Sequence, residues 1–129
     1  MSGTMRDLPR RPLVAILTAI VLTLAAPAPA QEGVRSGHMP GASCLPFGLV
    51  LTESGSLRSR DELELVFANA GAGPNARVIT SCGSGVTAAI LFLALATIGA
   101  ENAAVYDGSW SEWGDEKNES ELFPVVADL

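Results

Sequence analysis

The six residues Cys82-Gly83-Ser84-Gly85-Val86-Thr87 constrain the fold most, because they join a strand pattern to a helix pattern. The short run at 77–80 contains three β-branched residues, and the apolar run from Val86 to Ile98 ends at Gly99. A β-branched run favours a strand, whereas an apolar run closed by glycine is typical of a buried helix. The sequence therefore predicts a strand, a glycine-bearing loop and a buried helix in succession.

Cys82 lies at the start of this loop, in front of the expected helix. A helix N-terminus offers unpaired backbone N–H groups and the positive end of a dipole, so it stabilises an anion. At such a position a cysteine pKa falls by about one unit or more from roughly 8.5. The sequence thus predicts a reactive thiolate at Cys82, which we expect to be alkylated ahead of Cys44. A bulkier residue at Gly83 or Gly85 is expected to spoil the loop.

Three other chemistries fit the loop less well. A phosphate-binding P-loop needs Lys and then Ser or Thr after its second glycine, whereas this loop has Val86 and Thr87. A cysteine-dependent phosphatase needs an arginine at position 88, which is Ala88 here. The other soft metal ligands, Cys44 and His38, are not at zinc-site spacing, so no metal site is predicted.

Flanking patterns predict the remaining elements. Ser59-Arg60-Asp61-Glu62 has the spacing of a capping box, and the helix that it starts carries apolar residues on one face up to Gly71. A further strand at 103–106 follows the buried helix, which makes a parallel βαβ unit. The fold class expected is α/β, with a small parallel sheet and helices against both faces.

Three motifs together resemble a known family. The loop at 82–87, with Gly37-His38-Met39-Pro40-Gly41-Ala42 before it and Tyr106-Asp107-Gly108-Ser109-Trp110-Ser111-Glu112-Trp113 after it, resembles the catalytic C-terminal half of a tandem rhodanese. The type is that of thiosulfate or 3-mercaptopyruvate sulfurtransferases, and the resemblance covers residues 33–114. The upstream motif, His38 included, is expected to be structural, and the downstream motif mostly scaffold whose loop lies near the active site.

The resemblance implies a sulfurtransferase that carries sulfur as a persulfide on Cys82. The residues expected to hold the donor or the persulfide are Gly83, Ser84, Gly85, Val86 and Thr87; Thr87 is alternatively a helix cap. The partners implied are a small-molecule sulfur donor and a thiol or cyanide acceptor, without a metal or organic cofactor.

The sequence also departs from the family. It lacks the Asp-x-Arg motif that ends the family's first strand and the arginine of the helix that follows. We therefore expect a single rhodanese-like domain at 31–114 without its first strand and helix, and weak or absent turnover. The alternatives are a sulfur-carrier or sulfur-binding module and a gene remnant.

The first 30 residues have the order of a secretory signal peptide. Arginines 6, 10 and 11 precede an apolar run at 13–26, and Ala28-Pro29-Ala30 offers a cleavage site before Gln31. The run is shorter than the roughly 20 residues of a membrane span, so no stable membrane insertion is expected. Either the protein is exported to the periplasm or the medium, or the N-terminus is a shifted version of the missing strand and helix in a cytoplasmic protein.

The net charge and the second cysteine limit the remaining functions of the protein. The net charge is −6 over 129 residues, which argues against nucleic-acid binding. Residues 115–129 are expected to form an acidic tail with a solvated loop at 115–121. Cys44 is expected to be a buried apolar residue, although in an oxidising compartment a disulfide to Cys82 would block the nucleophile.

Overall fold

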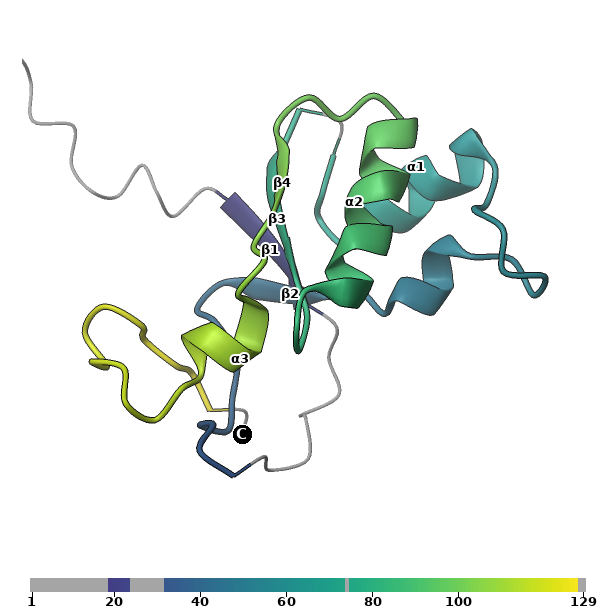
Figure 1. Cartoon of the computed structure of the whole chain (residues 1–129). Coiled ribbons are helices and arrows are strands. Elements are labelled where there is room, and N and C mark those ends of the chain that lie inside the picture. Colours follow the sequence, from purple (N-terminus) through teal and green to yellow (C-terminus); the bar gives the residue numbers. More distant parts are fainter. Residues whose placement is uncertain (1–18, 24–31, 74, 128–129) are drawn as a thin grey trace, which may run out of the picture.

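The computed structural model describes residues 19–23, 32–73 and 75–127, which form an α/β fold (Figure 1). Its sheet has four parallel strands in the order β2-β1-β3-β4. The strands are β1 (Ala19–Thr23), β2 (Ala42–Cys44), β3 (Arg77–Ser81) and β4 (Ala103–Val105). The helical elements are η2 (Phe47–Val50), α1 (Arg60–Asn69), α2 (Val86–Thr97) and α3 (Ser109–Trp113). The predicted fold class is confirmed.

The predicted strand-loop-helix-strand unit is present as β3, α2 and β4. β4 lies parallel to β3, with Val78 opposite Ala103 and Thr80 opposite Val105. α2 ends one residue earlier than its pattern predicts, and Gly99 beyond it has a φ of 81°, the left-handed conformation that favours glycine after a helix. This unit fixes the direction in which the loop after β3 leaves the sheet.

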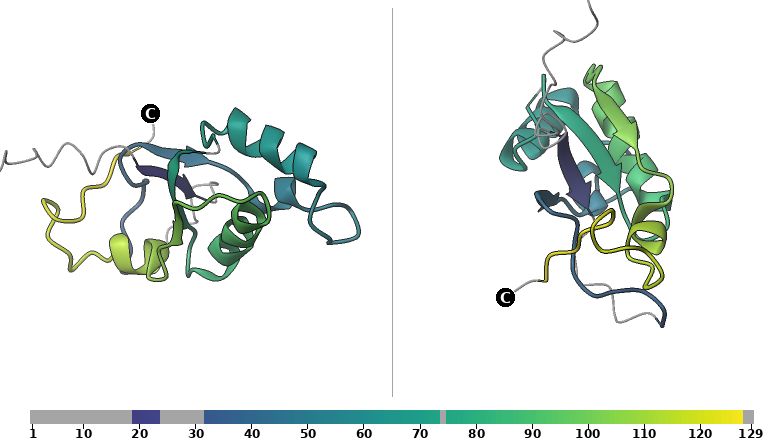
Figure 2. Two further views of the ribbon diagram at one scale, coloured as in Figure 1. Left: turned by 90° about the horizontal axis from the view of Figure 1, so that it is seen from above. Right: turned by 90° about the vertical axis from the view of Figure 1, so that its left-hand side faces the viewer.

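The core lies between the sheet and two helices on one side of it. Figures 1 and 2 show α1 and α2 on the same side, and their buried side chains form one cluster with Val78 of β3. The largest contributors from the helices are fully or almost fully buried: Leu63, Phe67, Leu91 and Leu95. The expectation of helices against both faces is therefore wrong for these two helices, because both bury their apolar faces in the same cluster.

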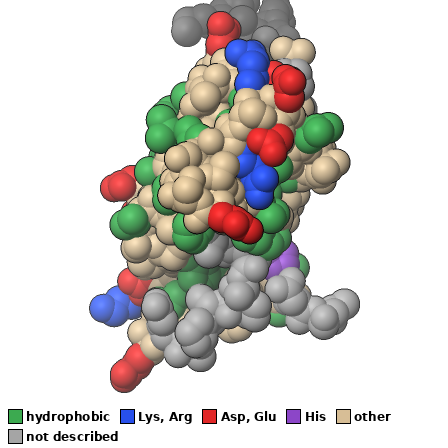
Figure 3. Space-filling view, turned by 90° about the vertical axis from the view of Figure 1, so that its right-hand side faces the viewer, with side chains coloured by type: hydrophobic (Ala, Val, Ile, Leu, Met, Phe, Trp, Pro, Cys, Tyr) green, Lys and Arg blue, Asp and Glu red, His purple; other side chains and the backbone are tan. Residues whose placement is uncertain are grey.

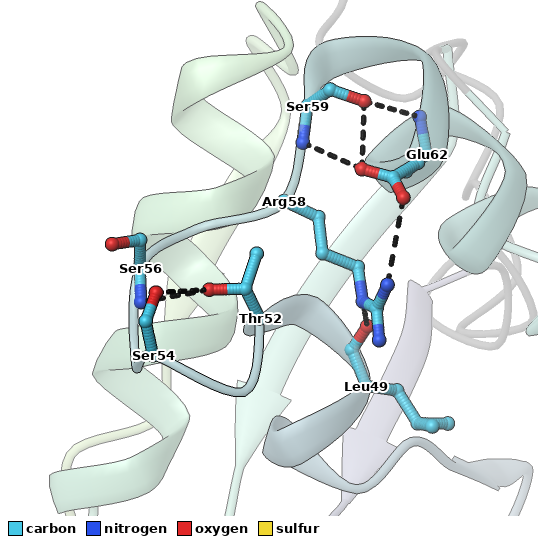
Figure 4. A network of polar contacts seen from close by, with 7 residues as sticks. All are labelled: Leu49, Thr52, Ser54, Ser56, Arg58, Ser59 and Glu62. Carbon is cyan, nitrogen blue, oxygen red and sulfur yellow. Dashed lines mark hydrogen bonds and ion pairs between the residues drawn. The ribbon is translucent and has the colours of Figure 1, made fainter.

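The predicted capping box starts α1 (Figure 4). The Ser59 hydroxyl accepts a hydrogen bond from the Glu62 backbone N–H at 3.4 Å, and the Glu62 carboxylate accepts from the Ser59 backbone N–H at 3.0 Å. The hydrogen bond from the Ser59 hydroxyl at 2.8 Å is the main cause that lowers the pKa of Glu62. Arg58 ties this helix start to η2, because its guanidinium donates to the Leu49 carbonyl at 2.9 Å and lies 3.5 Å from Glu62.

The outer surface of the helices carries charges of both signs. Figure 3 shows basic side chains beside acidic ones on this face, with hydrophobic side chains between them. On α1, Arg60 and Glu64 form a salt bridge at 3.0 Å. In the described part of the chain, no helix is long and apolar enough to cross a membrane.

β1 lies inside the apolar run that resembles the centre of a signal peptide. It pairs with β3 from Ala19 opposite Arg77 to Thr23 opposite Ser81, and with β2 on its other edge. The sequence predicts a domain without its first strand, whereas the structure has a strand here. Between β1 and β2, the structure describes residues 32–41, which contain no helix.

The segment after α3 is attached to the rest of the fold at both ends. Asp115 bridges to Val34, and Val126 pairs with His38 through two backbone hydrogen bonds of 2.9 Å. Of the residues 115–121 expected to form a solvated loop, 116, 117 and 119–121 are exposed, whereas 115 and 118 are half-buried. The pairing with Val126 gives the His38 backbone the structural role that was predicted for this residue.

Candidate active site

The candidate site begins where β3 ends, at Cys82. The Cys82 side chain is only 5% exposed, and its Sγ accepts a hydrogen bond from the Gly85 backbone N–H at 2.9 Å. Gly85 has a φ of 94° and is the residue immediately before α2. The chain therefore turns through a left-handed glycine and points the start of α2 at the sulfur.

Burial and hydrogen bonds act on the thiol in opposite directions. Burial raises the pKa of Cys82, because it removes water from the charged form. Hydrogen bonds to the sulfur from the Thr87 hydroxyl, and then from the backbone N–H groups of Ala88, Ser84 and Gly85, lower the pKa. The hydrogen bonds outweigh the effect of burial, and the pKa of Cys82 falls from 9.0 to about 7. The loop thus stabilises a thiolate near neutral pH.

Alkylation of Cys82 is expected to follow this titration. Because thiolate is the reactive form, the rate should rise about tenfold between pH 6 and pH 8 and level off above, with a midpoint near 7. In urea the midpoint should move towards the ordinary value of 9.0. Peptide-resolved mass spectrometry after short pulses of iodoacetamide measures both curves. The same midpoint in folded and unfolded protein would contradict the loop geometry.

The predicted loop residues do not all contact the sulfur in the same way. Gly85 donates its backbone N–H to the sulfur at 2.9 Å, and the Thr87 hydroxyl and the Ser84 N–H also lower the pKa of Cys82. Ala88, which the sequence analysis did not include, contributes a further backbone N–H. Val86 is 72% exposed, and Gly83 is exposed as well. The part predicted for these two residues in holding the persulfide stays a prediction.

The start of α3 contacts the loop, as the resemblance implied. The Trp110 N–H donates to the Cys82 carbonyl at 2.8 Å, and the Ser111 N–H donates to the Gly83 carbonyl at 2.9 Å. The Ser109 hydroxyl accepts a hydrogen bond from the Cys82 N–H at 3.0 Å. Sequence reasoning assigned Ser109 no role of its own, because no spacing rule connects residues 27 positions apart.

The rest of this motif is scaffold. The Tyr106 hydroxyl donates to the Glu112 carboxylate at 2.7 Å; burial, and then this hydrogen bond, raise the pKa of Tyr106 to about 12. Trp113 stacks edge-on against Tyr106 and Phe123, with ring centroids 6.1 Å and 5.3 Å away. The Trp110 indole donates to the Arg35 carbonyl at 3.0 Å. Both tryptophans therefore fold back on the body of the domain, as predicted.

The arginines of the described residues are engaged away from the sulfur. Arg35 donates to the carbonyls of Trp113 and Phe123, at 2.8 and 2.9 Å, which gives it the structural role expected. Arg58 and Arg60 bind groups around α1. Arg77 is the first residue of β3, whereas Cys82 follows the last one. In the described part of the chain, no arginine is therefore seen to bind at the loop.

Cys44 is exposed rather than buried, which corrects the expectation for this residue. It ends β2 opposite Thr23 of β1, which in turn lies opposite Ser81 of β3. Two strand spacings put Cys44 about 10 Å from that end of β3, whereas disulfide-bonded Cα atoms lie within about 7 Å. A disulfide to Cys82 would therefore require the backbone to move. Among the described residues, no group of three or more His, Cys, Asp or Glu side chains could hold a metal ion.

The predicted buried helix is buried on one face only, since Val86 and Leu93 of α2 are exposed. Fold and loop together define a class: a parallel α/β domain that presents a cysteine at the N-terminus of a helix packed on the sheet. Comparison with known proteins gives the family. A family model described as a rhodanese-like domain matches residues 29–116, so the chain belongs to the rhodanese family.

Relatives of known name are sulfurtransferases. The chain is 49% identical over 84 residues to a 3-mercaptopyruvate sulfurtransferase of Escherichia coli, covering 65% of this chain and 30% of the relative. It is 43% identical over 95 residues to thiosulfate/3-mercaptopyruvate sulfurtransferase 2 of Arabidopsis thaliana, covering 74% and 27%. The crystal structure of SseA from Escherichia coli, described with the rhodanese fold, matches with a TM-score of 0.61 and 41% identity, covering 74% of this chain and 37% of SseA. The chain thus spans 27% to 37% of the length of these relatives.

Proposed function

We propose that this protein is a sulfurtransferase that carries a sulfane sulfur on Cys82, with thiosulfate or 3-mercaptopyruvate as donor. The observation that carries the proposal is the set of hydrogen bonds converging on Cys82 Sγ, which lowers its pKa to about 7. A thiolate at neutral pH is the nucleophile that sulfur transfer requires. The names of the relatives support this reaction class.

The reaction proceeds in two displacements. The Cys82 thiolate attacks the outer sulfur of thiosulfate; a new S–S bond forms, the donor S–S bond breaks, and sulfite leaves with the electron pair. Cyanide or a thiolate then attacks the outer sulfur of the Cys82 persulfide, and the thiolate of Cys82 is released as the leaving group. The electron pairs balance without an external oxidant or reductant. The N–H groups of Ser84, Gly85 and Ala88 stabilise the negative charge at each stage.

A second candidate is a sulfur carrier that loads once and turns over slowly. It is favoured by the arginines, because those of the described residues serve structural contacts or lie at the other end of β3. A donor carboxylate or sulfonate would therefore be bound weakly at the loop. The protein is expected to accept one sulfur on Cys82 and to show low turnover.

Mass spectrometry of the full chain after incubation with thiosulfate or 3-mercaptopyruvate tests the proposal. The expected result is a gain of one sulfur on Cys82, removed by cyanide, in wild type and in the Cys44→Ser control, and no gain in Cys82→Ser. Steady-state cyanolysis then separates an enzyme from a carrier. A folded wild-type protein that gains no sulfur on Cys82 with either donor would refute the proposal.

A further inference from the structure

Ser109 lies at the first position of α3, yet its side chain is fully buried against the nucleophile's own residue. Its Oγ accepts the Cys82 N–H at 3.0 Å, donates to the Tyr106 carbonyl at 2.9 Å and lies 3.9 Å from Cys82 Sγ. One hydroxyl therefore contacts both the backbone and the sulfur of Cys82.

The backbone of Ser109 is strained. With a φ of 48°, it is the one residue other than glycine with a positive φ in the part of the chain that the structure describes. A side chain is disfavoured in this conformation, whereas glycine adopts it freely. Strained residues cluster at functional sites, where a contact compensates for the strain. The compensating contact here is the hydroxyl, which a glycine could not provide.

We propose that Ser109 is a positioning residue for Cys82, whose hydroxyl holds the Cys82 N–H and turns its hydrogen from the Tyr106 carbonyl to Sγ when the sulfur becomes charged. The inference deepens the proposed function and rests on it. A hydroxyl has a single hydrogen, so it donates to Tyr106 or to Cys82 Sγ but not fully to both. A thiolate or persulfide anion accepts a hydrogen bond more strongly than a neutral carbonyl does. Charge on the sulfur therefore favours rotation of the Ser109 hydroxyl hydrogen towards Sγ.

Other titratable groups lie around this contact. Asp107 precedes Ser109 by two residues, and its carbonyl and carboxylate lie close to Gly85. Tyr106 and Glu112 are paired with each other. Two other elements lie beside this contact, α2 and β3. The first turn of α2 carries no acidic residue, and Arg77 lies at the other end of β3. These groups are unchanged when only Ser109 is replaced, so a shift on replacement reports the hydroxyl.

The test compares the pH midpoint of Cys82 alkylation in Ser109→Ala, Ser109→Gly and Ser59→Ala. Both Ser109 variants are expected to raise the midpoint by about one pH unit, so that alkylation at pH 6 slows about tenfold, since a hydrogen bond to the charged form is lost. Ser59→Ala removes a serine hydroxyl from the start of α1, far along the chain from the loop. It controls for lost stability and should keep the wild-type midpoint.

Ser109→Gly relieves the backbone strain, so it serves where Ser109→Ala fails to fold. A wild-type midpoint in either folded Ser109 variant would overturn the inference, and so would an equal shift in Ser59→Ala. Sulfur loading is measured separately on the same proteins. Failure of wild type to load would refute the proposed function, while the alkylation midpoints would still decide whether Ser109 positions Cys82.

Discussion

Replacement of Gly85 by alanine is expected to remove the neutral-pH reactivity of Cys82. Gly85 has a φ of 94°, and an added Cβ would lie 2.6 Å from the backbone carbonyl oxygen of Asp107. The left-handed backbone alone costs about 1 to 3 kcal/mol for a side chain, and the overlap with a backbone atom forces the loop to move as well. The Gly85 N–H then leaves Sγ, so alkylation at pH 7 should fall by about tenfold or more.

Gly99→Ala is the matched control for this change. Gly99 has a φ of 81° at the other end of α2, and an added Cβ would meet only the Arg60 guanidinium at 3.8 Å. It should lower the melting temperature while the Cys82 midpoint stays near 7. A Gly85→Ala protein that folds and keeps that midpoint would show that the loop does not depend on this glycine. At Gly83 an added Cβ would meet no heavy atom within 4 Å, so the expected sensitivity is confined to Gly85.

Removal of residues 1–30 is expected to abolish cooperative folding. β1 pairs with β2 on one edge and β3 on the other, so a chain that begins at Gln31 would separate β2 from the rest of the sheet. It would also leave the edge of β3 unpaired, which favours aggregation. Thermal melting followed by circular dichroism should show no sharp transition. A chain that begins at Pro12 keeps β1 and should melt as the full chain does.

This experiment also bears on localisation. Cleavage before Gln31 would remove β1. The same residues cannot both be cleaved off as part of a signal peptide and pair in the sheet of Figure 1. We propose that the segment is retained as a strand. Cell fractionation with N-terminal sequencing distinguishes the two: an N-terminus at Gln31 in the periplasm or medium would contradict retention, especially if that shorter chain melts cooperatively.

The sequence predicted well those features that depend on neighbouring residues. The capping box at Ser59, the limits of α2 and the turn into the thiol loop each follow from residues a few positions apart. The hydrogen bonds to Cys82 from the start of α2 follow from the same local geometry. In such cases backbone geometry alone determines which groups meet.

Features that depend on distant residues were missed. An apolar run such as 13–26 has the same composition whether it belongs to a signal peptide or contains a strand of a sheet, so the pattern alone could not identify β1. Nor could the positions of Ser109 and Cys44 be derived, because they depend on which strands and helices pack together. The positive φ of Ser109 has no signature in the sequence apart from its place after Asp107-Gly108.

The backbone hydrogen bonds from Trp110 and Ser111 to the thiol loop make the end of the chain part of the same unit as the nucleophile. Trp113, three residues after Trp110, packs on Phe123, and its indole donates to the Pro124 carbonyl at 2.9 Å. Local unfolding of residues 119–126 therefore frees one side of α3, whose backbone N–H groups at Trp110 and Ser111 hold the loop carbonyls. The free energy of that opening sets how often these two hydrogen bonds to the loop break, so any molecule that binds residues 119–126 would change the stability of the loop without touching Cys82.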